Sequence, residues 1–127
     1  MKGARFKKGE RLKSRRIIKA LFANGHSFGA YPLRLVYMPI PAAPYPVQFT
    51  ATVPRRKFPR AVQRNRIKRQ IREAWRLHKN DLYQLGLQDD LSYAFLVIYV
   101  AKEPLPYRDI ERGMCKMIQR FRKKEGL

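Results

Sequence analysis

RNRIKRQIREAWR, residues 64–76, carries six cations and still keeps its apolar side chains at helical spacing. Apolar positions that recur every three or four residues form the face of a helix that packs on a core; here they are Ile67, Ile71, Ala74, Trp75, His78 and Leu82. At about 100° per residue, a neighbouring stripe collects Asn65, Lys68, Arg69, Arg72, Arg76 and Lys79, with Arg64 at its margin. The stretch therefore predicts an anchored helix with a row of cations. It begins near residues 60–61 and ends near residue 80, or at the latest at residue 85.

One helix and two strands are predicted before this stretch. Ser14 is a suitable N-cap for a helix that runs to about residue 23, and Gly25 suits the left-handed position after its last turn. Residues 33–38 and 47–53 alternate between apolar and polar side chains, which indicates strands. Prolines lack a backbone donor, so we expect the proline-rich residues 39–46 to form a stiff loop between these strands.

A strand and a last helix are predicted after it. Residues 91–100 are almost continuously apolar, as in a central strand covered on both faces. Residues 107–121 repeat apolar side chains at helical spacing. The order α-β-β-α-β-α predicts one α/β (α+β) domain over residues 1–127, a two-layer sandwich with helices on a small central sheet and a βαβ crossover around the basic helix. We expect the basic residues 1–13 to be flexible when free.

The charge balance points to a polyanionic partner. Lys and Arg number 29 against nine Asp and Glu, giving a net charge of +20, while 45% of the residues are hydrophobic. Such a chain can fold, but its cations repel one another until an anion offsets them. The single cysteine excludes an internal disulfide. We expect a cytoplasmic nucleic-acid-binding protein without a membrane partner, since no apolar run is long enough for a span and no apolar segment follows the N-terminal cations.

A solvated charged face is the alternative reading of the basic stripe. An ordinary solvated face mixes signs, whereas here Glu73 is the only nearby acid. Like charges four residues apart, such as Lys68, Arg72 and Arg76, destabilise an isolated helix by roughly 0.2–0.5 kcal/mol per pair. Their presence favours phosphate binding over a solvated face.

No catalytic constellation emerges from the sequence. His26 and His78 lie far apart without a cysteine or carboxylate at ligand spacing, and no glycine-rich phosphate loop is present. Asp81, Asp89 and Asp90 read as exposed acids, not as a two-metal site. We therefore predict no catalytic residue and no metal site in this chain.

Two segments resemble a known family. Residues 53–76, VPRRKFPRAVQRNRIKRQIREAWR, resemble the signature region of the bacterial ribonuclease P protein component. The matching positions there are Ala61, Val62, Arg64, Asn65, Arg66, Lys68, Arg69, Arg72 and Glu73. The N-terminal segment is also similar to the family pattern, at Phe6, Lys8, Arg11 and Leu12.

The resemblance implies an accessory role in a ribonucleoprotein. In this family the protein assists removal of the 5′ leader from precursor tRNA, while the catalytic RNA subunit holds the divalent metal ions. It implies as partners the RNA subunit and precursor tRNA, no cofactor bound by the protein alone, Mg²⁺ in the holoenzyme, and a monomeric protein. It also implies a left-handed βαβ crossover, although the usual hand is right.

The resemblance further implies three groups of site residues. The RNA subunit would be bound by Arg64, Asn65, Arg66, Lys68, Arg69, Arg72 and Arg76. A cleft between the first helix and the sheet would hold the single-stranded leader, lined by Ile18, Phe22, Val36 or Tyr37, Phe49 and Lys57. The N-terminal contacts would be Phe6, Lys8 and Arg11.

One position departs from the family pattern, and two rival functions stay open. Pro59 stands where the family has glycine, so we expect the entry into the basic helix to differ in detail. The rivals are a ribosomal or other structural RNA-binding protein without a processing role, and a stand-alone nuclease. The presence of both motifs favours the ribonuclease P reading over the first rival, and the lack of a catalytic constellation disfavours the second.

Overall fold

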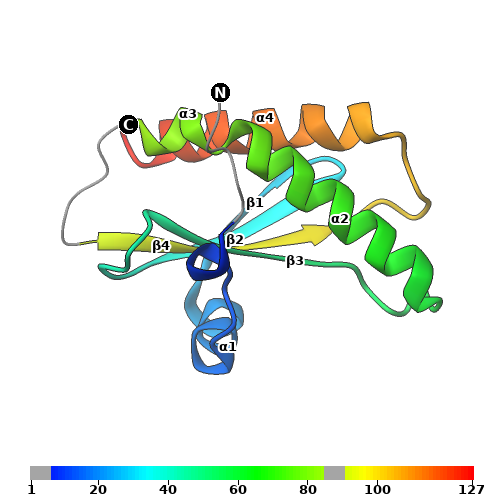
Figure 1. The fold of residues 1–127 in the computed structure, drawn as a ribbon, viewed down its shortest axis with the longest axis horizontal. Helices are drawn as coiled ribbons and strands as arrows, with labels where there is room; N and C mark the ends of the chain where they lie inside the picture. Colours follow the sequence, from blue (N-terminus) through cyan, green and yellow to red (C-terminus); the bar gives the residue numbers. More distant parts are fainter. Residues whose placement is uncertain (1–6, 85–90) are drawn as a thin grey trace.

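The computed structural model describes residues 7–84 and 91–127, which form a four-stranded sheet with helices on both faces (Figure 1). In chain order the elements are η1 (Lys8–Glu10), α1 (Arg15–Asn24), β1 (His26–Ala30), β2 (Leu33–Pro41), β3 (Val47–Thr52), α2 (Ala61–His78), α3 (Asn80–Tyr83), β4 (Leu91–Tyr99) and α4 (Tyr107–Lys124). The strand order is β1-β2-β4-β3, with β3 parallel to β4 and the other pairs antiparallel. The predicted α+β sandwich around a small sheet is confirmed, and α1 adds a layer on the second face.

The sequence of β4 explains its central place. Alternate residues such as Phe95 and Val97 join the core under α2 and α4, whereas Ala94 and Leu96 join a second cluster under α1. Because both faces are covered, both sets of side chains are apolar. The near-continuous apolar run was therefore interpreted correctly.

Aromatic packing anchors α2 and α4 on the sheet. Trp75 of α2 is fully buried and stacks on Phe49 of β3, with ring centroids 4.8 Å apart and an interplanar angle of 9°. Phe121 of α4 meets Phe95 edge-on at 4.9 Å. Such pairs add specific geometry to the burial of large apolar surfaces, so they fix the orientation of both helices.

The sheet contains more strand than the sequence predicted. Residues 26–30 form β1, which was missed, and β2 continues through Pro39 and Pro41, which were assigned to a loop. The last residue of β2 that pairs with β1 is Tyr37, so one edge of β2 is open beyond it. An open edge tolerates the missing donor of proline.

The start of α1 was predicted correctly, but the predicted left-handed conformation of Gly25 was wrong. Ser14 Oγ accepts a hydrogen bond from the backbone N–H of Ile17 at 3.2 Å, as an N-cap does. Gly25 has a φ of −70°, so it does not occupy the left-handed region. A Cβ there would lie 2.5 Å from the carbonyl oxygen of Leu21 and 2.8 Å from Cγ1 of Val36. Close approach between α1 and β2 therefore requires this glycine.

The described part of the N-terminal segment packs on the domain. Glu10 is fully buried, and its carboxylate accepts hydrogen bonds from Lys79 Nζ at 2.7 and 2.8 Å and from the hydroxyl of Tyr83. The backbone of Arg11 forms an isolated parallel β-bridge with Phe49 at the outer edge of β3. Residues 7–13, which we expected to be flexible, are thus tied to α2 and β3. Lys79 leaves the predicted cation stripe, because its ammonium group is buried with a carboxylate.

The predicted βαβ crossover is present, since α2 lies in the chain between the parallel neighbours β3 and β4. Its hand stays a prediction. The basic helix ends at His78 and is followed by the short α3, and residues 85 and 86 lie outside the described residues. Across residues 7–84 and 91–127, no helix has the length and apolar character needed to span a membrane.

Candidate nucleic-acid interface

The buried face of α2 sets the direction of its cations. Ile67, Ile71 and Trp75 are at most 1% exposed and fix the helix on the core. On the remaining surface, Asn65, Arg66 and Arg69 are exposed, while Arg64, Lys68, Arg72 and Arg76 are half-buried. The predicted row of cations is therefore present on α2, and the half-buried side chains in it are partly covered by the rest of the domain.

Four of these cations form no ion pair with any carboxylate of the described residues: Arg66, Lys68, Arg69 and Arg72. An exposed pair with an acid would compete with a phosphate for the same donors. These side chains therefore have guanidinium or ammonium groups available to an anion.

Arg11 joins the α2 cations. Burial lowers the pKa of Arg72, and the positive charges of Arg11 and Arg69 lower it further. The backbone bridge of Arg11 to Phe49 fixes this N-terminal residue beside the helix. Three guanidinium groups from two segments thus share one region, where a phosphate would relieve their repulsion.

Arg64 has a structural task besides any contact with RNA. Its Nη1 donates to the carbonyl oxygens of Phe58 at 2.9 Å and Pro59 at 2.8 Å. The guanidinium group therefore ties the loop before α2 to the first turn of the helix. This arrangement accommodates Pro59, whose own carbonyl is one of the acceptors.

Arg76 is the least available member of the row. Its Nε and Nη2 donate to the two carboxylate oxygens of Glu73 at 3.0 and 2.7 Å. The hydrogen bonds raise the pKa of Arg76 and lower that of Glu73. A phosphate at Arg76 would have to displace this bidentate carboxylate, so we expect it to contribute less than Arg69.

On the α1 face of the sheet, the structure brings some predicted cleft residues together. Ile18 is half-buried against the cluster that contains Val36, and Phe22 is 65% exposed. Lys57 is exposed in the loop after β3, and its Nζ donates to the carbonyl oxygen of Val100 at 3.1 Å. Of the two alternatives at this place, Val36 is the one that faces α1.

Tyr37 and Phe49 do not lie on this face. Tyr37 is 3% exposed among Phe121 and its neighbours, and its hydroxyl donates to Glu125 at 2.9 Å. Burial, followed by this hydrogen bond, raises the pKa of Tyr37 to about 12. Phe49 is 1% exposed under Trp75. Side chains alternate along a strand, so Tyr37 points away from the face that Val36 occupies, and Phe49 follows Phe95 into the core.

A polar strip on β3 was missed as part of the site. Gln48, Thr50 and Thr52 pair with Ala94, Leu96 and Ile98 of β4, whose side chains face α1. The three polar side chains are half-exposed. Alternation had placed them together, but the sequence did not indicate which face α1 would cover.

Of the predicted N-terminal contacts, Lys8 is exposed on η1 and Arg11 is exposed beside α2. Phe6 lies outside the described residues, as do Asp89 and Asp90. His78 is half-buried and hydrogen-bonded to Glu111 of α4 at 2.8 Å. Within residues 7–84 and 91–127, no three His, Cys, Asp or Glu side chains gather in a way that could hold a metal ion.

Comparisons with known proteins agree on one family. A family model described as Ribonuclease P matches residues 6–122. The chain is 39% identical over 118 residues to the ribonuclease P protein component of Porphyromonas gingivalis, covering 90% of this chain and 84% of that protein. It is 42% identical over 79 residues to the ribonuclease P protein component of Chlorobaculum tepidum, covering 59% of this chain and 51% of that protein.

Two solved structures share the fold. The ribonuclease P protein of Staphylococcus aureus has a TM-score of 0.65 and 22% identity, over 88% of this chain and 94% of that chain. The ribonuclease P protein of Thermotoga maritima has a TM-score of 0.66 and 21% identity, over 87% and 96%.

Proposed function

Because the chain belongs to the ribonuclease P protein family, we propose that its α2 cations bind the catalytic RNA subunit and its α1 face holds the 5′ leader of precursor tRNA. The chain is the protein component of a ribonucleoprotein endoribonuclease and acts in the maturation of tRNA 5′ ends. In this proposal the RNA subunit binds the divalent metal ions, Mg²⁺ above all, which activate water for phosphodiester hydrolysis. The protein binds no cofactor of its own.

The observation that carries the proposal is the fixed cluster of Arg11, Arg69 and Arg72. Arg69 is exposed and Arg72 is half-buried on α2, and neither forms an ion pair with a carboxylate of the described residues. Burial lowers the pKa of Arg72, and the positive charges of Arg11 and Arg69 lower it further, so the three guanidinium groups lie in one electropositive region. The buried face of α2 anchors the helix on the core, so the backbone positions that carry Arg69 and Arg72 are fixed relative to each other. A polyphosphate backbone gains from such preorganised charge, because little order has to be created on binding.

The α1 face supports leader binding by a different chemistry. Phe22 offers an exposed ring, and base stacking on aromatic side chains is worth about 1–3 kcal/mol per base. The half-exposed strip of Gln48, Thr50 and Thr52 offers hydrogen-bonding groups on the same face of the sheet, and Lys57 adds a cation in the loop after β3. A single strand of any sequence can use these contacts.

Reconstitution with the catalytic RNA subunit tests the proposal. We expect the protein to restore leader cleavage at low magnesium, and we expect its affinity for the RNA to fall by orders of magnitude between about 50 and 200 mM salt. Arg69→Glu with Arg72→Glu should weaken this affinity and flatten the salt dependence. The matched control is Arg112→Glu with Lys116→Glu, which reverses two exposed cations four residues apart on α4.

Three outcomes would contradict the proposal. A binding curve that does not respond to salt would exclude phosphate contacts as the main attraction. Equal losses in the α2 and α4 double variants would show that net charge, and not the α2 surface, determines binding. Cleavage by the protein with no RNA present would instead favour a stand-alone nuclease.

A further inference from the structure

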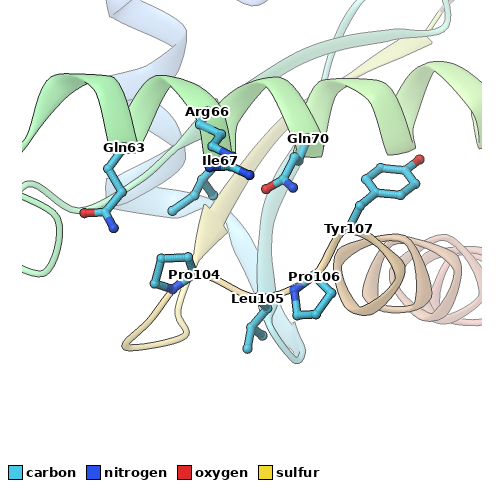
Figure 2. A pocket seen from close by; sticks show the side chains of 8 residues that line it. All are labelled: Gln63, Arg66, Ile67, Gln70, Pro104, Leu105, Pro106 and Tyr107. Carbon is cyan, nitrogen blue, oxygen red and sulfur yellow. The ribbon is translucent and has the colours of Figure 1, made fainter.

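A groove runs along α2 beside the cation row, between the helix and the segment that joins β4 to α4 (Figure 2). It consists of two adjoining cavities of about 290 and 380 Å³. Both cavities are lined by Arg66, Gln70 and Tyr107. The groove is thus continuous with the surface that binds RNA in the proposed function, but it has a different lining.

The walls of the groove suit a flat heterocycle. Ile67 lies in the α2 wall and is almost fully buried, and Pro104, Leu105 and Pro106 form the opposite apolar wall. The ring of Tyr107 extends from the start of α4 toward α2 (Figure 2). Prolines have a fixed φ, so this wall is stiff before any ligand binds.

Two carboxamides supply polar contacts within these walls. Gln63 and Gln70 point from α2 toward the proline segment (Figure 2). Neither side chain makes a hydrogen bond to another of the described residues. A carboxamide offers both a donor pair and an acceptor, which is what the edge of a nucleobase requires.

The cations lie where the backbone of such a ligand would run. Arg66 lines both cavities, and Arg69 lines the larger one. Glu73 is the one acid in the lining, and its carboxylate is occupied by Arg76 at 2.7 Å. A phosphate is therefore favoured at the Arg66–Arg69 side and disfavoured at the Glu73 end.

We propose that this groove binds a single unpaired nucleobase of RNA whose sugar–phosphate backbone lies on Arg66 and Arg69. The inference rests on the proposed function, since it assumes that α2 docks on folded RNA. Bases inside a helix cannot reach the groove, because their faces are stacked and their edges paired; a bulged or extruded base can. A protein recognises duplex RNA mainly by its shape. The groove would let this protein bind selectively where the duplex has a bulged or extruded base.

Short RNA hairpins test the proposal with the full-length protein. Three hairpins are compared by fluorescence anisotropy: one with a single-nucleotide bulge, one with an abasic residue at the bulge, and one fully paired. Stacking of one base predicts about tenfold tighter binding of the bulged hairpin than of either control. The abasic hairpin separates the base from the bend that a bulge introduces.

Variants locate the effect in the groove. The hydroxyl of Tyr107 is buried without a hydrogen-bond partner among the described residues, so Tyr107→Phe keeps the ring and should keep the tenfold preference. Tyr107→Leu should abolish it. Gln70→Met removes a carboxamide at a half-exposed position and should reduce the preference even if the Tyr107→Leu protein is poorly folded.

The result that overturns the inference is equal binding of the bulged and abasic hairpins, or a preference that survives both Tyr107→Leu and Gln70→Met. Binding of all three hairpins that still depends on Arg69 and Arg72 would then leave the proposed function intact. Loss of dependence on those arginines would contradict the proposed function itself.

Discussion

At the scale of single residues, the buried pair of Glu10 and Lys79 connects the N-terminal segment to the end of α2. The side chains are 1% and 3% exposed, and the carboxylate also accepts from the backbone N–H of Lys7 at 2.9 Å and from Tyr83. Burial, followed by the hydrogen bond to Glu10, raises the pKa of Tyr83. The pair holds Lys7–Arg11 in place, and with it the guanidinium group of Arg11.

We predict that Lys79→Met destabilises the protein by about 3–5 kcal/mol, because it leaves a buried carboxylate without its cation. The free energy of unfolding from urea titration measures this change. The double variant Glu10→Leu with Lys79→Met should recover most of the loss, since it removes both charges. Arg112→Met is the control, as its 3.5 Å pair with Asp109 is exposed and should cost about 1 kcal/mol or less. A loss in Lys79→Met no larger than in the control would contradict the prediction.

Lys79 also shows what the sequence could not predict at this scale. Helical spacing placed it on the cation stripe, and periodicity alone gave no sign of a partner sixty-nine residues away. Tyr37 and Phe49 were misplaced for a related reason. Alternation shows that neighbouring residues face opposite sides of a sheet, but the side that each helix covers depends on tertiary packing.

At the scale of elements, the strongest periodic patterns predicted best. The helix with buried Ile67, Ile71 and Trp75 and the apolar strand β4 appear as expected, because their side chains are buried in the manner that their spacing requires. β1 was missed since it is short, with the sequence HSFGA, and contains a glycine and two polar residues. Residues 39–41 were wrongly predicted to be a loop, because at an open strand edge the missing N–H of proline leaves no hydrogen bond of the sheet unmade.

The junction between α1 and β1 allows a test of close packing. We predict that Gly25→Ala destabilises the protein by about 1–3 kcal/mol, since its Cβ would meet a backbone carbonyl at 2.5 Å and the side chain of Val36 at 2.8 Å. Gly29→Ala is the matched control, because the nearest atom to its Cβ is Arg34 Nη1 at 3.7 Å. Thermal and urea unfolding of both variants measure the difference.

If the two alanine variants are equally stable, the contact between α1 and β2 yields more easily than the structure indicates. A loss confined to Gly25→Ala would establish that the glycine serves close approach, since its φ of −70° is accessible to any residue. The same variant should then also weaken binding at the α1 face, because α1 carries Phe22.

At the scale of the whole molecule, the sheet separates two kinds of surface. The α2 side presents guanidinium groups on a helix, and the α1 side presents the exposed ring of Phe22 and the polar residues of β3. The family resemblance predicted both surfaces, and their separation by the thickness of the sheet follows from the burial of β4 on both faces. The structure added the face of the sheet on which the polar strip of β3 lies, which alternation alone does not indicate, and the convergence of Arg11 with α2, which has no local signal in the sequence.

This separation predicts that the two binding steps can be weakened independently. Phe22→Ala should reduce the affinity of the reconstituted enzyme for precursor tRNA with a leader by about 5- to 100-fold, the range expected for one stacked base. It should leave the affinity for mature tRNA unchanged, because mature tRNA has no leader, and it should leave binding of the RNA subunit unchanged. Arg69→Glu with Arg72→Glu should weaken binding of the RNA subunit at every leader length. Because Phe22 is 65% exposed, its loss leaves the core intact, and unfolding curves verify this. Equal effects of Phe22→Ala on precursor and mature tRNA would place the leader elsewhere on the molecule.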